Sequence, residues 1–218
     1  MNLSRITLTG ADERTDLDGL VDLADRFTEV EIGLLYTVTP EGRPRYPSRD
    51  WLSRAASALS GRCAIHVCGM GARRELIAGD LADLTRHAPR VQVNGGLQVE
   101  EAEALASLVG TLMTQHNIAN GSLLGVQARN HAILIDASGG RGTSPDSWVL
   151  PATEKQIGFA GGMGADNLFA EYTRISSLAR PGSWSDMEGK LRIDDWFSLE
   201  LAARCAEIHR HFARSMAF

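Results

Sequence analysis

Short apolar runs alternate with amphipathic stretches along the whole chain, and this rhythm sets the expected architecture. Parallel strands buried on both faces appear as short apolar runs, whereas the helices that cover them carry apolar residues on one stripe. The expected strands are 6–9, 30–38, 63–68, 90–94, 110–115, 131–136, 156–160 and 183–187. The expected helices are 17–27, a helix capped by Ser48, 72–87, 99–108, 119–128, 166–178 and 194–216, with 139–152 mostly loop.

Eight consecutive βα units predict a protein of the α/β class that folds as a closed (βα)8 barrel. An open, doubly wound sheet with fewer strands is the structural alternative. No linker or low-complexity tract interrupts the pattern, so residues 1–218 are expected to form a single barrel domain.

Composition agrees with such a barrel and argues against several kinds of partner. Apolar residues make up 44% of the 218 positions and charged residues 22%, which is ordinary for a globular domain. The net charge of −5 is spread along the chain and gives no electrostatic reason to expect nucleic acid or an anionic membrane. No apolar run approaches the roughly 20 residues that span a bilayer, and the N-terminus does not resemble a signal peptide.

The cysteines favour a reducing compartment. Cys63, Cys68 and Cys205 have neither metal-ligand nor disulfide spacing, and the first two lie on opposite faces of one expected strand. We therefore expect a cytoplasmic protein, and no metal or other cofactor motif is present.

Side-chain parity places polar groups at one end of the expected barrel. Alternate strand residues point inward, and the last of them lies at the C-terminal face, where barrel enzymes hold their active sites. In strand 63–68, Ile65 and Val67 suit the helix layer, so His66 and Cys68 point inward. The same parity turns further polar side chains inward, namely Thr7, Thr9, Gln92, Asn94, Gln115 and Asp136. Buried polar groups need partners, so this end predicts a binding or catalytic site for a small molecule.

Asp136 is the first catalytic candidate. It ends an apolar run and precedes small residues, and desolvation of a carboxylate at such a place can raise its pKa, which suits a general acid. A loop-ordering or helix-capping aspartate is the alternative.

Other groups are weaker candidates. The glycine clusters 139–142 and 161–164 suit close approach to an anion, with Arg141 adding a charged contact, but each is also compatible with an ordinary turn. His66 and Cys68 suggest a thiolate–imidazole pair, although a core histidine beside an apolar cysteine is favoured. His209 and His211 are expected to be solvated groups on the last helix.

Four segments in order carry a resemblance to a known family: 43–48 (RPRYPS), 91–95 (VQVNG), 134–148 (LID, GGRG and a tryptophan) and 160–168 (AGGMGADNL). Together they resemble phosphoribosylanthranilate isomerase, the tryptophan-pathway barrel that converts an aminoaldose phosphate to an aminoketose by an Amadori rearrangement. The resemblance implies that Asp136 is the general acid that protonates the furanose ring oxygen. It also implies that Arg45 lies near the anthranilate end of the substrate and that Gln92 ends the fourth strand at the site. Backbone sites around the substrate phosphate would be Gly140, Gly142, Gly161 and Gly162.

The chain departs from that family at two important places. The family's general base is a cysteine at the end of the first strand, where this chain has Thr9, whose hydroxyl cannot remove a carbon-bound proton unaided. On the eighth strand, Asp186 and Glu188 replace a small loop that contacts phosphate, and they would repel a phosphate unless Lys190 or Arg192 compensates. A family histidine is also replaced, by Asn94.

Three hypotheses follow from this mixture. The first is an aldose–ketose isomerase acting on a sugar phosphate, with Cys68 or His66 as base. The second is a different barrel enzyme on a small acid or sugar, in which Asp186 and Glu188 form the acid–base pair or hold a divalent cation. The third is a non-catalytic ligand-binding barrel, which a mouth filled by Trp184 or Met163 would favour. The expected partner is a phosphorylated or carboxylated small molecule, and the protein is expected to be a monomer or a homodimer.

Overall fold

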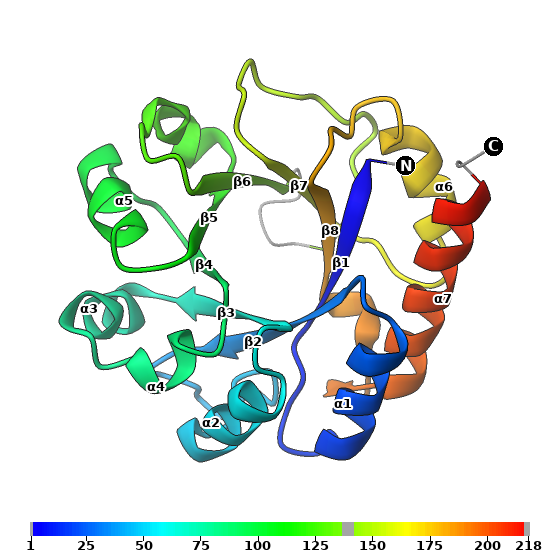
Figure 1. Ribbon diagram of the computed structural model, residues 1–218, viewed down its shortest axis with the longest axis horizontal. Helices are drawn as coiled ribbons and strands as arrows, with labels where there is room; N and C mark the ends of the chain where they lie inside the picture. The colour runs from blue at the N-terminus through cyan, green and yellow to red at the C-terminus, as the bar shows by residue number, and fades with distance from the viewer. Residues whose placement is uncertain (1, 137–141, 216–218) are drawn as a thin grey trace.

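A closed barrel of eight parallel strands forms the centre of the protein, as predicted (Figure 1). The computed structural model describes residues 2–136 and 142–215. Neighbouring strands pair in chain order, and β8 pairs with β1 to close the barrel. The strands are β1 (Leu3–Thr9), β2 (Val30–Tyr36), β3 (Cys63–Cys68), β4 (Arg90–Asn94), β5 (Thr111–His116), β6 (His131–Asp136), β7 (Ile157–Ala160) and β8 (Ser183–Met187).

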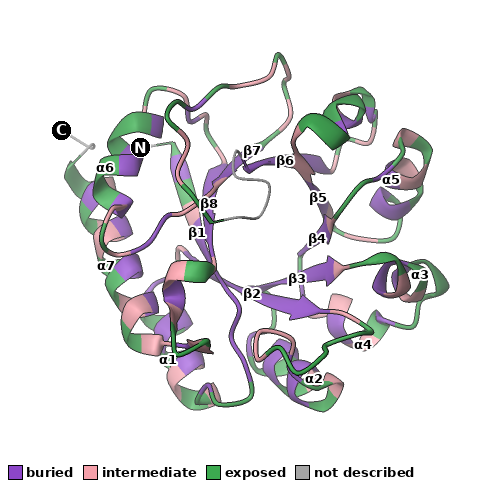
Figure 2. Ribbon diagram, turned by 180° about the vertical axis from the view of Figure 1, so that it is seen from behind, coloured by how far each residue is buried: buried purple, intermediate pink, exposed green. Residues whose placement is uncertain are grey.

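Helices pack around the outside of the barrel. They are α1 (Leu17–Arg26), α2 (Arg49–Ala58), α3 (Met70–Ala78), α4 (Ala82–Thr85), α5 (Val99–Ala106), α6 (Leu168–Ile175) and α7 (Leu199–Ser215), with 3-10 segments η1 (Ile118–Gly125) and η2 (Gly189–Leu191). Figure 2 shows the consequence for burial, with the strands buried and the outer faces of the helices exposed. The cap predicted at Ser48 is present, because its hydroxyl accepts the main-chain N–H of Trp51 (3.4 Å).

Three predicted helices differ from the structure. The helix expected over 72–87 is divided into α3 and α4, because Gly79 adopts a left-handed conformation (φ 84°) that ends α3. The segment expected as helix 119–128 forms only the 3-10 segment η1. The last helix begins at Leu199 rather than at residue 194, because the preceding residues form a hairpin of β9 (Arg192–Ile193) and β10 (Trp196–Phe197).

The interior of the barrel is filled below its C-terminal end. A small apolar cluster of Ala64, Met113, Ala132, Leu134 and Trp184 lies inside the strands, separate from the larger core between strands and helices. Gly158 makes room for the Trp184 indole, since a Cβ built on this glycine would lie 2.2 Å from the ring. The tryptophan therefore closes the inside of the barrel beneath the site.

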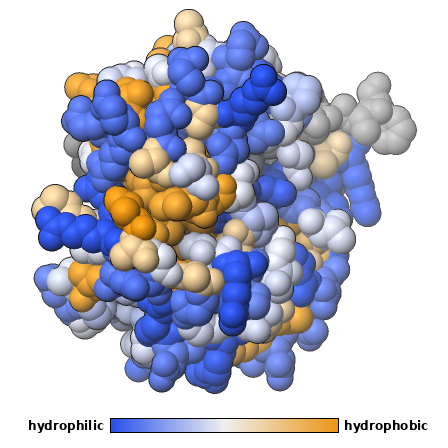
Figure 3. Space-filling view, turned by 60° about the vertical axis from the view of Figure 1, so that its left-hand side comes forward, coloured by the Kyte–Doolittle hydropathy of each residue, from blue (hydrophilic) through white to orange (hydrophobic). Residues whose placement is uncertain are grey.

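The outer surface is mixed in character. Met70 and Ile77 of α3 are among the exposed large apolar side chains, and Figure 3, which brings the side of α3 and α5 forward, shows apolar side chains gathered in one patch among polar ones. Within residues 2–136 and 142–215, none of the helices combines the length and apolar character that crossing a membrane requires.

Candidate active site

A cavity of about 460 Å³ opens at the C-terminal ends of the strands, and we call it the mouth. It lies where the sequence analysis expected the site. Its lining includes most of the site residues predicted from the sequence: Thr9, Arg45, His66, Gln92, Asn94, Gln115, Asp136, Gly142, Gly161, Gly162, Asp186 and Glu188. Cys68 is not part of this lining. Gly140 and Arg141 lie outside the described residues.

Asp186 is the most strongly perturbed acid in the mouth. Its carboxylate lies at the end of β8, where the hydroxyl of Thr9 on β1 donates to Oδ1 (2.7 Å). Burial raises the pKa of Asp186 to about 7, the nearby charges of Glu31 and Asp136 raise it as well, and the Thr9 hydrogen bond opposes them. A carboxyl with a pKa close to neutrality can both accept and return a proton at neutral pH.

Asp136 lies at the end of β6 and is as buried as Asp186. The side-chain amide of Gln115 donates to its Oδ2 (3.3 Å). Because the charge of Asp136 raises the pKa of Asp186, the two carboxyls act on each other within one mouth. The structure thus holds two carboxyls on different strands of the same cavity, a geometry that suits proton transfer at two places on one ligand.

His66 lies fully inside the mouth as a neutral ring. Burial lowers the pKa of its imidazole to about 4. Its Nε2 lies 3.9 Å from Oδ2 of Asp186, too far for a hydrogen bond, and has no hydrogen-bond partner among the described residues. His66 is therefore not the hydrogen-bonded core histidine that the sequence favoured.

No thiolate–imidazole pair forms between His66 and Cys68. The Cys68 thiol donates to the main-chain carbonyl of His66 (3.6 Å), not to its ring, and burial raises the pKa of the thiol. A buried thiol that keeps its proton is a poor base. The geometry consequently offers Asp186, rather than Cys68, as the base candidate nearest to Thr9.

An ion pair lies at the edge of the mouth next to Asp186. Arg45 binds Glu188 through Nη1 and Oε1 (2.6 Å), and burial raises the pKa of Glu188 against the opposing effect of Arg45. Lys190 also lines the mouth and binds the exposed Asp166 (2.7 Å).

Of the two cations expected to compensate the β8 carboxylates, Lys190 alone lines the mouth. Arg192 is nearly buried and donates to the carboxylate of Asp12 (2.8 Å) and the carbonyl of Gly10 (2.6 Å). Its charge is therefore engaged in holding the loop after β1.

The glycine loop after β7 is shaped by close backbone contact. Gly161 and Gly162 have φ values of 130° and 59°, and a Cβ on Gly162 would lie 2.5 Å from the main-chain nitrogen of Ser144. Asn167, just before α6, donates to the Gly162 carbonyl (2.9 Å) and accepts the N–H of Gly164 (2.9 Å). Asn167 and Ser144 were not predicted from the sequence, although an asparagine directly before a helix is a recognisable loop-ordering signal.

Other predicted residues have structural roles. Trp184 lies below the mouth, and Met163 lines it without filling it, so the cavity remains open. His209 was expected to be solvated, which is wrong: it is buried, and its Nδ1 pairs with the Tyr172 hydroxyl (2.8 Å). His211 is exposed, as predicted. Within the described part of the chain, no three His, Cys, Asp or Glu side chains are grouped so that they could hold a metal ion.

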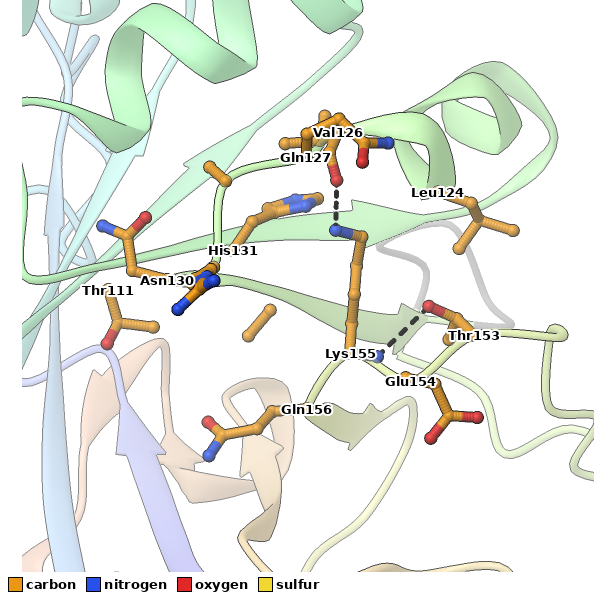
Figure 4. A pocket seen from close by; sticks show the side chains of 13 residues that line it. Thr111, Leu124, Val126, Gln127, Asn130, His131, Thr153, Glu154, Lys155 and Gln156 are labelled. Carbon is orange, nitrogen blue, oxygen red and sulfur yellow. Dashed lines mark hydrogen bonds between the residues drawn. The ribbon is translucent and has the colours of Figure 1, made fainter.

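A larger hollow of about 560 Å³ lies at the opposite, N-terminal ends of β5, β6 and β7. Figure 4 shows Lys155 reaching across it, with its ammonium donating to the Val126 carbonyl (2.5 Å) and its main-chain N–H to the Thr153 hydroxyl (3.2 Å). Its one carboxylate side chain, Glu154, is exposed. We assign the candidate active site to the mouth, because the mouth contains the two buried, interacting carboxyls at the catalytic face of the barrel.

Comparisons with known proteins show likeness in the fold. No family model matches the chain, and no curated protein matches it by sequence. TrpF from Jonesia denitrificans is similar with a TM-score of 0.71 and 15% identity, over 96% of this chain and 98% of that one. Phosphoribosyl anthranilate isomerase from Thermus thermophilus has a TM-score of 0.70 and 18% identity, over 95% and 98%.

Phosphoribosyl anthranilate isomerase from Thermotoga maritima has a TM-score of 0.71 and 16% sequence identity, over 96% of this chain and 100% of that one. The fold is thus of the kind that the sequence motifs indicated.

Proposed function

We propose that the chain is an enzyme that converts an aldose derivative of a sugar phosphate into a ketose by an Amadori-type isomerisation in the mouth. The observation that carries the proposal is the buried Asp186, which accepts the Thr9 hydroxyl and shares the mouth with Asp136. In such a reaction one group must protonate an oxygen and another must take a proton from carbon. Two carboxyls on different strands meet that requirement.

Asp136 is the acid and Asp186 the base in this proposal, and because the two carboxyls interact, the reactive form of the pair holds one proton, on Asp136, and one charge, on Asp186. Asp136 protonates the ring oxygen, the bond from that oxygen to C1 breaks, and the nitrogen lone pair forms a C1=N iminium. Asp186 then removes the proton from C2, and the C2–H electrons form C1=C2 while the iminium electrons return to nitrogen. The resulting enolamine becomes a ketone at C2 when its hydroxyl proton leaves and C1 takes a proton.

The substrate phosphate would lie at the glycine loop. Gly142, Gly161 and Gly162 line the mouth there, and Lys190 supplies a cation on the same side. Backbone amides next to glycines and a nearby ammonium are a common phosphate-binding combination. Supporting this choice, one of the similar solved structures, with a TM-score of 0.70, is phosphoribosyl anthranilate isomerase in complex with reduced 1-(o-carboxyphenylamino)-1-deoxyribulose 5-phosphate.

A different barrel activity on a small acid or sugar, through Asp186 and Glu188, is the second candidate. Both side chains line the mouth, and burial raises the pKa of each. The ion pair with Arg45 engages Glu188, however, which leaves it a weaker acid–base partner for Asp186 than Asp136 is.

The test is a fluorescence assay with phosphoribosylanthranilate generated in situ. The native chain, Asp136→Asn and Asp186→Asn are compared with Asp22→Asn, an exposed position on α1. We expect turnover that either mouth variant lowers by about 10²- to 10⁴-fold and that the α1 variant leaves unchanged. Native turnover no greater than that of Asp136→Asn would refute this substrate.

A further inference from the structure

Two buried polar atoms without hydrogen-bond partners lie on neighbouring strands of the mouth. They are Nε2 of His66 on β3 and Oε1 of Gln92 on β4, and the two residues are paired in register. His66 is 1% exposed and Gln92 3%, and both line the mouth. Native structures rarely leave such buried polar atoms without hydrogen-bond partners. Two of them in one cavity therefore indicate that a bound ligand supplies the partner. We call His66, Gln92 and Asp186 the floor of the mouth.

A chain of hydrogen bonds fixes which atom of the Gln92 amide is left unpaired. The Cys68 thiol donates to the His66 carbonyl, so its sulfur is free to accept the side-chain amide of Asn94 (3.2 Å). Asn94 then presents its oxygen, which accepts the Gln92 amide N–H (2.9 Å). Reversing the Gln92 amide would place two oxygens against each other, so its oxygen remains as an unpaired acceptor.

The chemistry of the floor selects a particular kind of ligand group. Because burial lowers the pKa of His66 to about 4, its ring is neutral, with one nitrogen donating and one accepting. Gln92 needs a donor, and Nε2 of His66 needs a donor or an acceptor according to its tautomer. A phosphate or carboxylate oxygen cannot donate to Gln92, and the nearby Asp186 and Asp136 would repel its charge.

We propose that the floor binds a hydroxyl group of the sugar, which donates to Oε1 of Gln92 and accepts a hydrogen bond from His66 in its Nε2–H tautomer. The inference rests on the proposed function in that the ligand is a sugar. It adds that the uncharged polyol part lies against β3, β4 and β8, leaving the charged group to the glycine loop. It also gives Asn94 and Cys68 a positioning role, because their hydrogen bonds orient the Gln92 amide.

The experiment uses the whole chain with ¹⁵N-labelled histidine and two neutral probes. Ribitol carries hydroxyls along its length, whereas 1,5-pentanediol has the same carbon chain without the internal ones. Titration of ribitol should shift the His66 imidazole resonances, and 1,5-pentanediol should not. His131, a second buried histidine near the opposite end of the barrel, should keep its resonances throughout and serves as the internal control.

The Gln92→Leu variant tests the named acceptor. Losing one hydrogen bond should weaken ribitol binding about two- to tenfold, and unchanged His131 resonances would show that the fold is retained. A His66 signal that ignores ribitol, or that responds equally to both probes, would overturn the proposal without any variant. Equal ribitol affinity in Gln92→Leu would overturn the role of Oε1.

Ribitol has neither phosphate nor carbonyl, so its binding does not depend on turnover. Ribitol binding without isomerase activity would refute the proposed reaction and keep the floor subsite. Isomerase activity without a ribitol response at His66 would support the proposed reaction and refute the floor subsite.

Discussion

The raised pKa of Asp186 predicts a stability that depends on pH in a specific way. The carboxyl has a pKa of about 7 in the folded chain and about 3.8 when exposed, so the folded state holds this proton more tightly than the unfolded state. Stability from this group is therefore lost as the pH rises from about 4 to 7, and the loss is constant above that range. Asp186→Asn removes the ionisation and keeps an oxygen that accepts the Thr9 hydroxyl.

The magnitude follows from the size of the shift. About three pKa units correspond to about 4 kcal/mol at pH 8, where the folded carboxyl is ionised, and to about 1.5 kcal/mol at pH 5. The difference in unfolding free energy between Asp186→Asn and the native chain should accordingly grow by about 2.5 kcal/mol in favour of the variant from pH 5 to pH 8. A constant offset caused by the substitution itself cancels in this comparison.

Urea unfolding followed by circular dichroism at pH 5, 6, 7 and 8 measures the difference. Changes in unfolding free energy with pH that come from other titratable groups are common to both proteins and also cancel. Asp166→Asn is the matched control, because the ion pair with Lys190 lowers the pKa of this exposed carboxyl and its removal should not favour the variant at high pH. A difference that stays flat between pH 5 and 8, or that falls, would show that Asp186 ionises freely, and the proposed base would lose its physical basis.

Three further predictions concern the scaffold. Gly158→Ala should lower the free energy of unfolding by about 1–3 kcal/mol, since the new Cβ would overlap the Trp184 ring; an unchanged melting temperature would contradict this packing. Arg192→Met should cost about 3–5 kcal/mol in urea unfolding, because it leaves the fully buried carboxylate of Asp12 without its cation partner, and a near-neutral effect would contradict the buried pair. Burial lowers the pKa of His209 to about 4, so the native chain loses stability as the pH falls from 6.5 towards 4. His209→Gln should lose less than the native chain over that range, and parallel pH profiles would contradict this.

Much of the scaffold could be predicted from the sequence, because its strands are apolar runs bounded by turn residues. The bounds expected for β3, β4, β6 and β8 are those found, and parity correctly turned His66, Gln92 and Asp136 towards the mouth. Helix ends were less predictable. The end of α3 depends on the left-handed conformation of Gly79, and an isolated glycine in a helical pattern does not by itself predict that conformation.

The error at His209 was avoidable. Ala202, Cys205, Ala206 and Phe212 are buried on α7, and His209 falls on the same stripe at helical spacing. That position buries the neutral imidazole of His209 beside the Tyr172 hydroxyl. By contrast, the pKa of Asp186 depends on side chains from several strands, and nothing local in the sequence around residue 186 reports it.

The closure of the barrel brings Thr9 and Asp186 together, and each explains the other's place in the site. The two residues are 177 positions apart, and they meet because β1 pairs with β8. A threonine at the end of β1 cannot serve as a base, but its hydroxyl can donate to a carboxylate and hold one oxygen in place. The carboxylate in turn needs such a donor, because burial and the neighbouring charges of Glu31 and Asp136 disfavour its ionised form. Without that hydrogen bond the pKa of Asp186 would be higher, and fewer molecules would carry its ionised form at neutral pH. Under the proposed reaction, Thr9 and Asp186 thus form a single physical arrangement, in which the Thr9 hydroxyl adjusts the proton affinity of the proposed base.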